Sequence, residues 1–166
     1  MNQVEMNKQA KLSAHFTLGE LTRSKSHPEV YNIPSRVHIE NLKRVCVWLE
    51  ALRARYNERY VLGGSEVLRG AGEEPIVITS GYRSAELNRK VGGVATSNHL
   101  TGCAVDIRVA GKEQLIRYAC ILLDYADETR QDFDEILLEH GANGVIWLHF
   151  AVRAQGNRRK ISFLKA

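Results

Sequence analysis

Three side chains that could bind a metal ion stand out in the sequence: His99, Asp106 and His149. The first two lie seven residues apart in the stretch 97–106 (SNHLTGCAVD), where Gly102 permits a tight turn between them. Two imidazoles and one carboxylate suit zinc, which takes four tetrahedral ligands and in catalytic sites keeps one position for water. A water at that position ionises near neutral pH and becomes a nucleophile. The residue types therefore favour a hydrolytic zinc site.

Two predicted strands can bring these side chains together. In residues 104–109 alternation places Asp106 on the face opposite the aliphatic side chains, and in residues 145–152 it places His149 on the same face as Trp147. Neighbouring strands lie about 4.8 Å apart. We therefore expect Asp106 and His149 to converge on one open face, with His99 reaching it from a loop.

A hydrolytic site also needs a group that takes a proton, and Glu139 is the candidate. It ends a predicted strand over 133–139, before the turn 141–144 (GANG) that leads into 145–152 as an antiparallel hairpin. Cross-strand pairing is expected to bring Glu139 beside His149. Each residue also has an ordinary structural alternative: a hydrogen-bonded histidine, an Asp106–Arg108 pair, or an exposed glutamate. Spacing alone makes the metal site feasible without establishing it.

The remaining elements predict an α+β fold. Ser35 is a candidate N-cap for a long amphipathic helix that runs to Tyr56, and residues 112–126 predict a second helix. A short strand over 76–79 and a short helix after Ser84 complete the pattern. We expect one domain over 1–166 with a small, mainly antiparallel sheet and helices packed on one side. Residues 1–14 are predicted to form a polar arm and 154–166 a basic tail, either solvated or bound to an anionic surface.

Composition narrows the class of protein. The chain has 166 residues, a formal charge of +4 and a pI of about 9.0, and no apolar run long enough to span a membrane. Its three cysteines, with no CxxC spacing, argue against a disulfide framework or a cysteine zinc site. Helical periodicity predicts that Cys46 and Cys120 are buried, and Cys103 is expected to pack rather than to act as a nucleophile. The first residues do not look like a signal peptide, so synthesis in the cytoplasm is expected.

Three motifs in order along the chain resemble one known family. Residues 78–84 (ITSGYRS), the SxHxxGxAxD pattern of 97–106 and Trp147-x-His149 are similar to those of the zinc D-alanyl-D-alanine carboxypeptidases and related peptidoglycan peptidases. The resemblance implies a hedgehog/DD-peptidase-like fold. It also implies that His99, Asp106 and His149 ligate Zn²⁺.

The resemblance also implies roles for the surrounding residues. Glu139 would be the general base and acid, Arg83 would bind the substrate carboxylate or the developing oxyanion, and Ser97 and Trp147 would contact substrate. Two positions depart from the pattern: many relatives carry His where this chain has Trp147, and some carry Glu where it has Ile146. The base is therefore assigned to Glu139, as in relatives where it ends the preceding strand.

The expected function is zinc-dependent hydrolysis of peptide bonds in bacterial peptidoglycan stem peptides, at the cell wall or in the periplasm. Either a D-Ala-D-Ala carboxypeptidase or an endolysin-like endopeptidase fits. The alternative is a non-catalytic, metal-stabilised module that binds cell wall. Binding of a specific nucleic acid is disfavoured because no recognised motif supports it, and the sequence leaves the oligomeric state open.

Overall fold

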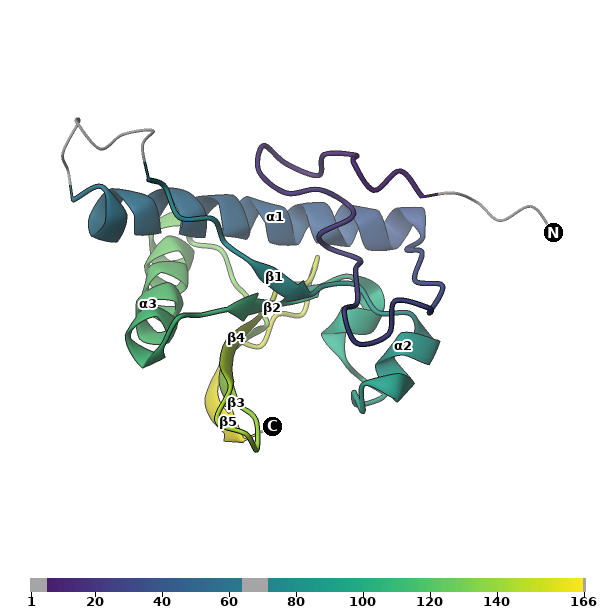
Figure 1. Ribbon diagram of the computed structural model, residues 1–166. Coiled ribbons are helices and arrows are strands. Elements are labelled where there is room, and N and C mark those ends of the chain that lie inside the picture. The colour runs from purple at the N-terminus through teal and green to yellow at the C-terminus, as the bar shows by residue number, and fades with distance from the viewer. Residues whose placement is uncertain (1–5, 64–71, 166) are drawn as a thin grey trace.

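A five-stranded sheet with strand order β1-β2-β4-β3-β5 forms the centre of the computed structural model, which describes residues 6–63 and 72–165 (Figure 1). The strands are β1 (Ile78–Ser80), β2 (Ala104–Arg108), β3 (Glu135–His140), β4 (Ile146–Ala151) and β5 (Lys160–Lys165). All neighbours pair antiparallel except β3 and β5, which are parallel. The predicted α+β class and the hairpin of β3 and β4 are confirmed.

The long helix α1 (Arg36–Tyr56) begins where the sequence predicts. The Ser35 side chain accepts a hydrogen bond from the His38 backbone, and the His38 side chain accepts one from the Ser35 backbone, which completes a capping box. One face of α1 is buried, and a π-helical turn, η1 (Asn57–Val61), follows its last residue. In Figure 1 α1 runs across the upper part of the view, above the labelled strands, and α3 (Lys112–Thr129) packs against both α1 and β4.

Aliphatic and aromatic side chains alternate with the site residues along the central strands. Val105 and Ile107 of β2, with Leu148 and Phe150 of β4, are fully buried on the face covered by α1 and α3. Trp48 of α1 packs onto this face, with its ring centroid 5.3 Å from that of Phe150. The opposite face of the same strands is thus left to Asp106 and His149, as alternation predicts.

Two short helices lie in the connection between β1 and β2. They are α2 (Ala85–Lys90), capped by Ser84, and the 3-10 helix η3 (Asn98–Thr101), and they contact each other. The described part of the polar arm is fastened to α1 through Glu50, which accepts a hydrogen bond from Ser13 (2.6 Å) and pairs with His15 (2.7 Å). Residues 1–5 of that arm lie outside the described residues.

Two sequence-based expectations are wrong. The segment expected to be a basic tail contains β5, because residues 160–165 pair in parallel with β3 and the preceding Arg158 binds the buried Asp134; Ala166 lies outside the described residues. Cys120, expected to be buried, is exposed, because the buried stripe of α3 passes through its neighbours Ala119 and Ile121. Cys46 and Cys103 are buried as expected.

None of the described helices is long and apolar enough to cross a lipid bilayer.

Candidate metal centre

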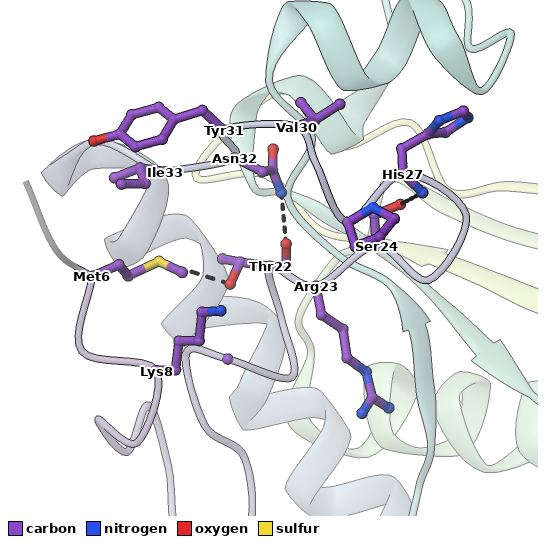
Figure 2. A pocket seen from close by; sticks show the side chains of 12 residues that line it. Met6, Lys8, Thr22, Arg23, Ser24, His27, Val30, Tyr31, Asn32 and Ile33 are labelled. Carbon is purple, nitrogen blue, oxygen red and sulfur yellow. Dashed lines mark hydrogen bonds between the residues drawn. The ribbon is translucent and has the colours of Figure 1, made fainter. Parts of the chain in front are cut away.

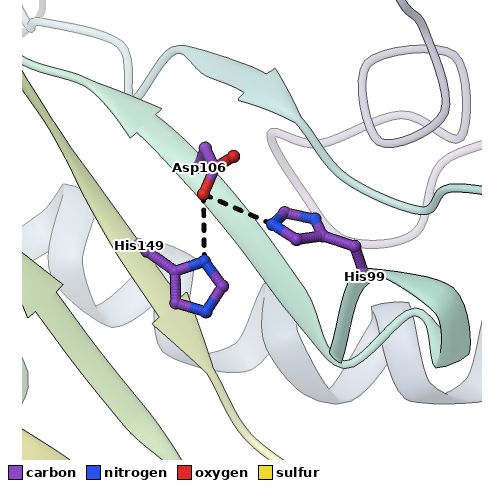
Figure 3. A group of neighbouring side chains, drawn as sticks. All are labelled: His99, Asp106 and His149. Carbon is purple, nitrogen blue, oxygen red and sulfur yellow. Dashed lines mark hydrogen bonds and ion pairs between the residues drawn. The ribbon is translucent and has the colours of Figure 1, made fainter. Parts of the chain in front are cut away.

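The three predicted ligands meet at one point of the sheet (Figure 3). Asp106 Oδ1 lies 3.0 Å from His149 Nδ1 and 3.3 Å from His99 Nε2, and the ligand atoms of the three residues lie within 4.8 Å of one another. Ligand atoms about 2.0–2.2 Å from a zinc ion would be separated by distances of this order after small side-chain adjustments. The donor set therefore fits a zinc ion.

Register and a glycine turn produce this convergence. Asp106 and His149 are direct partners in the β2–β4 ladder, so their side chains share one face. His99 arrives from η3, which ends at Gly102 with φ +74°. A Cβ on Gly102 would lie 2.6 Å from the His38 carbonyl oxygen, so η3 can press against the start of α1 only with glycine here.

Contacts outside the ligand set orient His99 and Asp106. The Nδ1 atom of His99 lies 2.7 Å from the Gly81 carbonyl oxygen, which turns Nε2 toward Asp106. Metal-binding histidines commonly donate their second ring nitrogen in this way. The other carboxylate oxygen of Asp106, Oδ2, accepts from the Arg83 guanidinium at 3.1 Å. Both ligands are therefore held with one atom directed at the common point.

Arg83 is itself fixed by polar partners. Its Nε donates to Ser80 Oγ at 2.9 Å, and its NH1 lies 3.5 Å from Asn88 Oδ1. The guanidinium thus lies next to the metal ligands, beside Asp106 and within the electrostatic range of Glu139. This position is compatible with a structural ion pair between Arg83 and Asp106. It is equally compatible with the predicted role of Arg83 in binding a substrate carboxylate or a developing oxyanion.

The pKa values of the three predicted ligands shift in different directions. Burial lowers the pKa of His99, which keeps it neutral as a metal ligand must be. Although burial opposes ionisation of Asp106, the neighbouring histidines lower the pKa of that carboxyl below its usual value. Burial also lowers the pKa of His149, but hydrogen bonds with Asp106 and Glu135 outweigh it and raise this pKa to about 9. A divalent cation supplies the same positive charge.

Glu139 lies on the same face of the sheet as His149, two residue pairs along the β3–β4 ladder. It pairs with Trp147, whose Nε1 donates to Glu139 Oε2 at 2.5 Å, while His149 pairs with Leu137. Burial raises the pKa of the half-buried Glu139 carboxyl. The expected direct pairing with His149 is replaced by a diagonal one, and Trp147 is placed against the carboxylate.

Ser97 stabilises the start of η3, the short helix that carries His99. It is the N-cap of η3, and its Oγ accepts from the His99 amide at 3.2 Å. The hydroxyl group thus supports the loop that carries His99.

Two polar residues next to the centre were missed in the sequence. Glu135 Oε1 lies 3.4 Å from His149 Nε2, and Asn98 Nδ2 donates to the same oxygen at 2.5 Å. Strand alternation places Glu135 on the face of Glu139, so this position could have been singled out as a second carboxylate. Asn98 had no comparable signal, because its partners are distant in sequence.

Two surface cavities are lined by residues other than the three ligands. The larger, about 520 Å³, is formed by Met6, Lys8 and residues from Gly19 to Ile33. Figure 2 shows Lys8 beside Thr22, and the Arg23 side chain turned away from Lys8. The smaller, about 310 Å³, is lined by polar residues that include Ser97, Asn98 and Arg153. The smaller cavity therefore adjoins the loop that carries His99.

Comparison with known proteins agrees with this geometry. The sequence model of the family described as Peptidase M15 matches residues 14–126, more than half of the chain. The matched region contains Arg83, His99 and Asp106, whereas Glu139 and His149 lie beyond it. No curated protein matches the chain. The chain belongs to the Peptidase M15 family, zinc-dependent peptidases that include D-Ala-D-Ala carboxypeptidases.

Proposed function

We propose that this metallopeptidase hydrolyses peptide bonds in the stem peptides of bacterial peptidoglycan. The observation that carries the proposal is the convergence of His99 Nε2, Asp106 Oδ1 and His149 Nδ1 on one face of the sheet. We assign these three as the zinc ligands. The peptidoglycan substrate is supported by the family and by the motifs 78–84 and 97–106, which resemble those of peptidoglycan peptidases.

Zinc bound here would polarise the scissile carbonyl and lower the pKa of a nearby water. Glu139 is proposed as the group that accepts the proton of the attacking water and returns it to the leaving amine. A carboxyl whose pKa is raised toward neutrality suits both steps better than an exposed one. The Trp147 hydrogen bond fixes the direction in which this carboxylate faces.

Arg83 is proposed to steady negative charge, either on the developing oxyanion or on a substrate carboxylate. A planar guanidinium can contact two oxygens at once, and such stabilisation is often a large catalytic contribution. Its contact with Asp106 Oδ2 keeps it beside the ligands. Ser97 and Trp147 are proposed to contact the peptide, through the hydroxyl proton of the first and the ring face of the second.

A digest of purified muropeptides, analysed by mass spectrometry with and without a chelator, tests the proposal. We expect cleavage that the chelator abolishes and zinc restores. Release of D-alanine would identify a carboxypeptidase, whereas new internal amino termini would identify an endopeptidase.

A pair of histidine variants provides the control. His99→Ala should lose both stoichiometric zinc and cleavage, while His140→Ala, at an exposed position at the end of β3, should keep both. Cleavage by a zinc-free His99→Ala protein would refute the assignment. Co-sedimentation with cell wall without any cleavage would favour the binding module instead.

A further inference from the structure

We propose that Glu135 is a positioning residue that orients His149 for zinc, and that Asn98 links it to the loop of the first ligand. The inference rests on the proposed zinc site. It concerns a hydrogen-bonded chain that starts at His149 and ends at Arg153 and Arg158, in the connection between β4 and β5. The three ligands do not themselves account for these contacts.

The two nitrogens of His149 face different partners. Nδ1 lies 3.0 Å from Asp106 Oδ1, at the point where the three ligands meet, and Nε2 lies 3.4 Å from Glu135 Oε1. An acceptor at Nε2 keeps the proton on that nitrogen and leaves the Nδ1 lone pair for the metal. Because the two nitrogens lie on different edges of the ring, Glu135 binds the edge turned away from the ligands, which separates its role from that proposed for Glu139.

Asn98 holds Glu135 in place. Its side-chain amide has two protons, and the two nearest carboxylates are Glu135, at 2.5 Å, and Asp134, at 2.7 Å. Its Oδ1 accepts from Arg153 Nε at 2.9 Å. Asn98 is 6% exposed and precedes His99 directly, so the group that fixes Glu135 belongs to the same short helix as the first ligand.

Two arginines compensate the paired carboxylates. Asp134 is fully buried, and Arg158 donates to both of its oxygens, from Nε at 3.0 Å and from NH2 at 2.7 Å. The same NH2 lies 3.7 Å from Glu135 Oε1, and Arg153 Nε lies 3.3 Å from Asp134 Oδ2. Two positive charges thus balance two negative ones, and Asn98 and Arg158 hold the same Glu135 oxygen, Oε1, that faces His149.

Zinc affinity, measured by competition with a chromophoric chelator, tests the inference without any need for activity. We expect Glu135→Ala to weaken zinc binding about 10- to 100-fold, and Glu135→Gln, which keeps an acceptor for Nε2, to recover most of the loss. Glu139→Ala, a change on the same strand and face, should abolish cleavage and leave zinc affinity within a few-fold. The urea midpoint of each metal-free variant shows how much of any change comes from folding.

A second readout follows the histidine itself. In nitrogen-15 spectra of the zinc-bound protein, the Nε2 proton of His149 should exchange slowly with water because Glu135 accepts it, and Glu135→Ala should make this exchange faster. Asn98→Ala should weaken zinc binding less than additively when combined with Glu135→Ala, because both act through one carboxylate.

The outcomes separate the two proposals. A wild-type protein that binds no stoichiometric zinc contradicts the proposed function. Stoichiometric zinc with unchanged affinity, and an unchanged exchange rate of the His149 Nε2 proton in Glu135→Ala, contradicts the positioning role alone.

Discussion

Two carboxylates on one face of β3 have opposite electrostatic surroundings. The hydrogen bond from His149 lowers the pKa of Glu135, whereas burial raises the pKa of Glu139. A carboxylate held as an anion suits a fixed acceptor, and one whose pKa lies nearer neutrality suits proton transfer. The different roles proposed for Glu135 and Glu139 therefore follow from the atoms that surround each carboxylate.

The proposed role of Glu139 gives a direct residue-scale prediction. Glu139→Gln removes the proton acceptor and keeps the Trp147 hydrogen bond, so kcat should fall about 10²- to 10⁴-fold while zinc stays bound. Steady-state kinetics on a muropeptide, with zinc content measured on the same sample, checks this. A variant that keeps kcat within a few-fold of the wild type would move the base to another residue.

At this scale, the sequence predicts the convergence of the ligands but not their supports. Alternation fixes the face on which Asp106 and His149 lie, and it holds for both. It does not specify which atoms meet across 36 or 37 residues, as Asn98 meets Asp134 and Glu135. Such contacts depend on side-chain packing that only the folded chain determines.

At the scale of elements, the turn that ends η3 depends on glycine at position 102. Gly102 and Gly92 both have φ +74°, but only at Gly102 would a Cβ meet backbone, the His38 carbonyl oxygen. Gly92→Ala should cost about 1–2 kcal/mol of unfolding free energy from left-handed strain alone. Gly102→Ala should cost more and should also weaken zinc binding, because η3 and His99 must shift.

Urea unfolding and zinc titration of the two glycine variants separate strain from displacement. Equal losses of stability in both variants, with unchanged zinc affinity, would show that the contact between η3 and α1 does not position His99.

The anchoring of β5 through Asp134 predicts a pH dependence. Burial alone would raise the pKa of Asp134, but hydrogen bonds from Arg158 and Asn98 lower it below the ordinary value near 3.9. A lowered folded-state pKa contributes stability above about pH 4, and this contribution is lost as the pH falls through the folded-state value. Asp134→Asn should therefore lose about 3–5 kcal/mol at neutral pH and progressively less below pH 4.

An exposed aspartate offers the matched control for this change. Asp132 pairs with Arg159 on the surface, so Asp132→Asn should cost no more than about 1 kcal/mol at any pH. Urea unfolding of the metal-free proteins between pH 3 and pH 7 gives both comparisons. A constant difference between wild type and Asp134→Asn across that range would exclude the proposed ionic contribution.

For the whole molecule, the class and most elements could be predicted, but one strand could not. Capping and periodicity predict α1 and α3, and the hairpin follows from its turn. The segment that contains β5 follows a run of arginines and forms a parallel pair with β3, which no local turn announces. Hydrogen bonds from Arg158 and Lys160 to Asp134 join the start of β5 to that of β3, and periodicity does not predict such contacts.

Zinc should stabilise the whole chain. A ligand that binds only the folded state adds about 2.7 kcal/mol to the unfolding free energy when its free concentration is 100 times its Kd. Thermal or urea unfolding with buffered zinc should show this gain in the wild type and in His140→Ala, and no gain in His99→Ala. A gain of equal size in His99→Ala would place the zinc elsewhere.

The position of β2 and β4 between other strands has a consequence for amide hydrogen exchange. Both strands are paired along both edges, whereas β5 is an edge strand of the sheet that the described residues form. Amides inside β2 and β4 should exchange with deuterium only when the entire chain opens, while amides on the outer edge of β5 exchange through local fraying. Zinc at 100 times its Kd should then slow deuterium uptake in β2 and β4 about 100-fold and leave the outer amides of β5 unaffected. The backbone beneath Asp106 and His149 would thus be in place before the ion arrives, and binding would require the motion of side chains only.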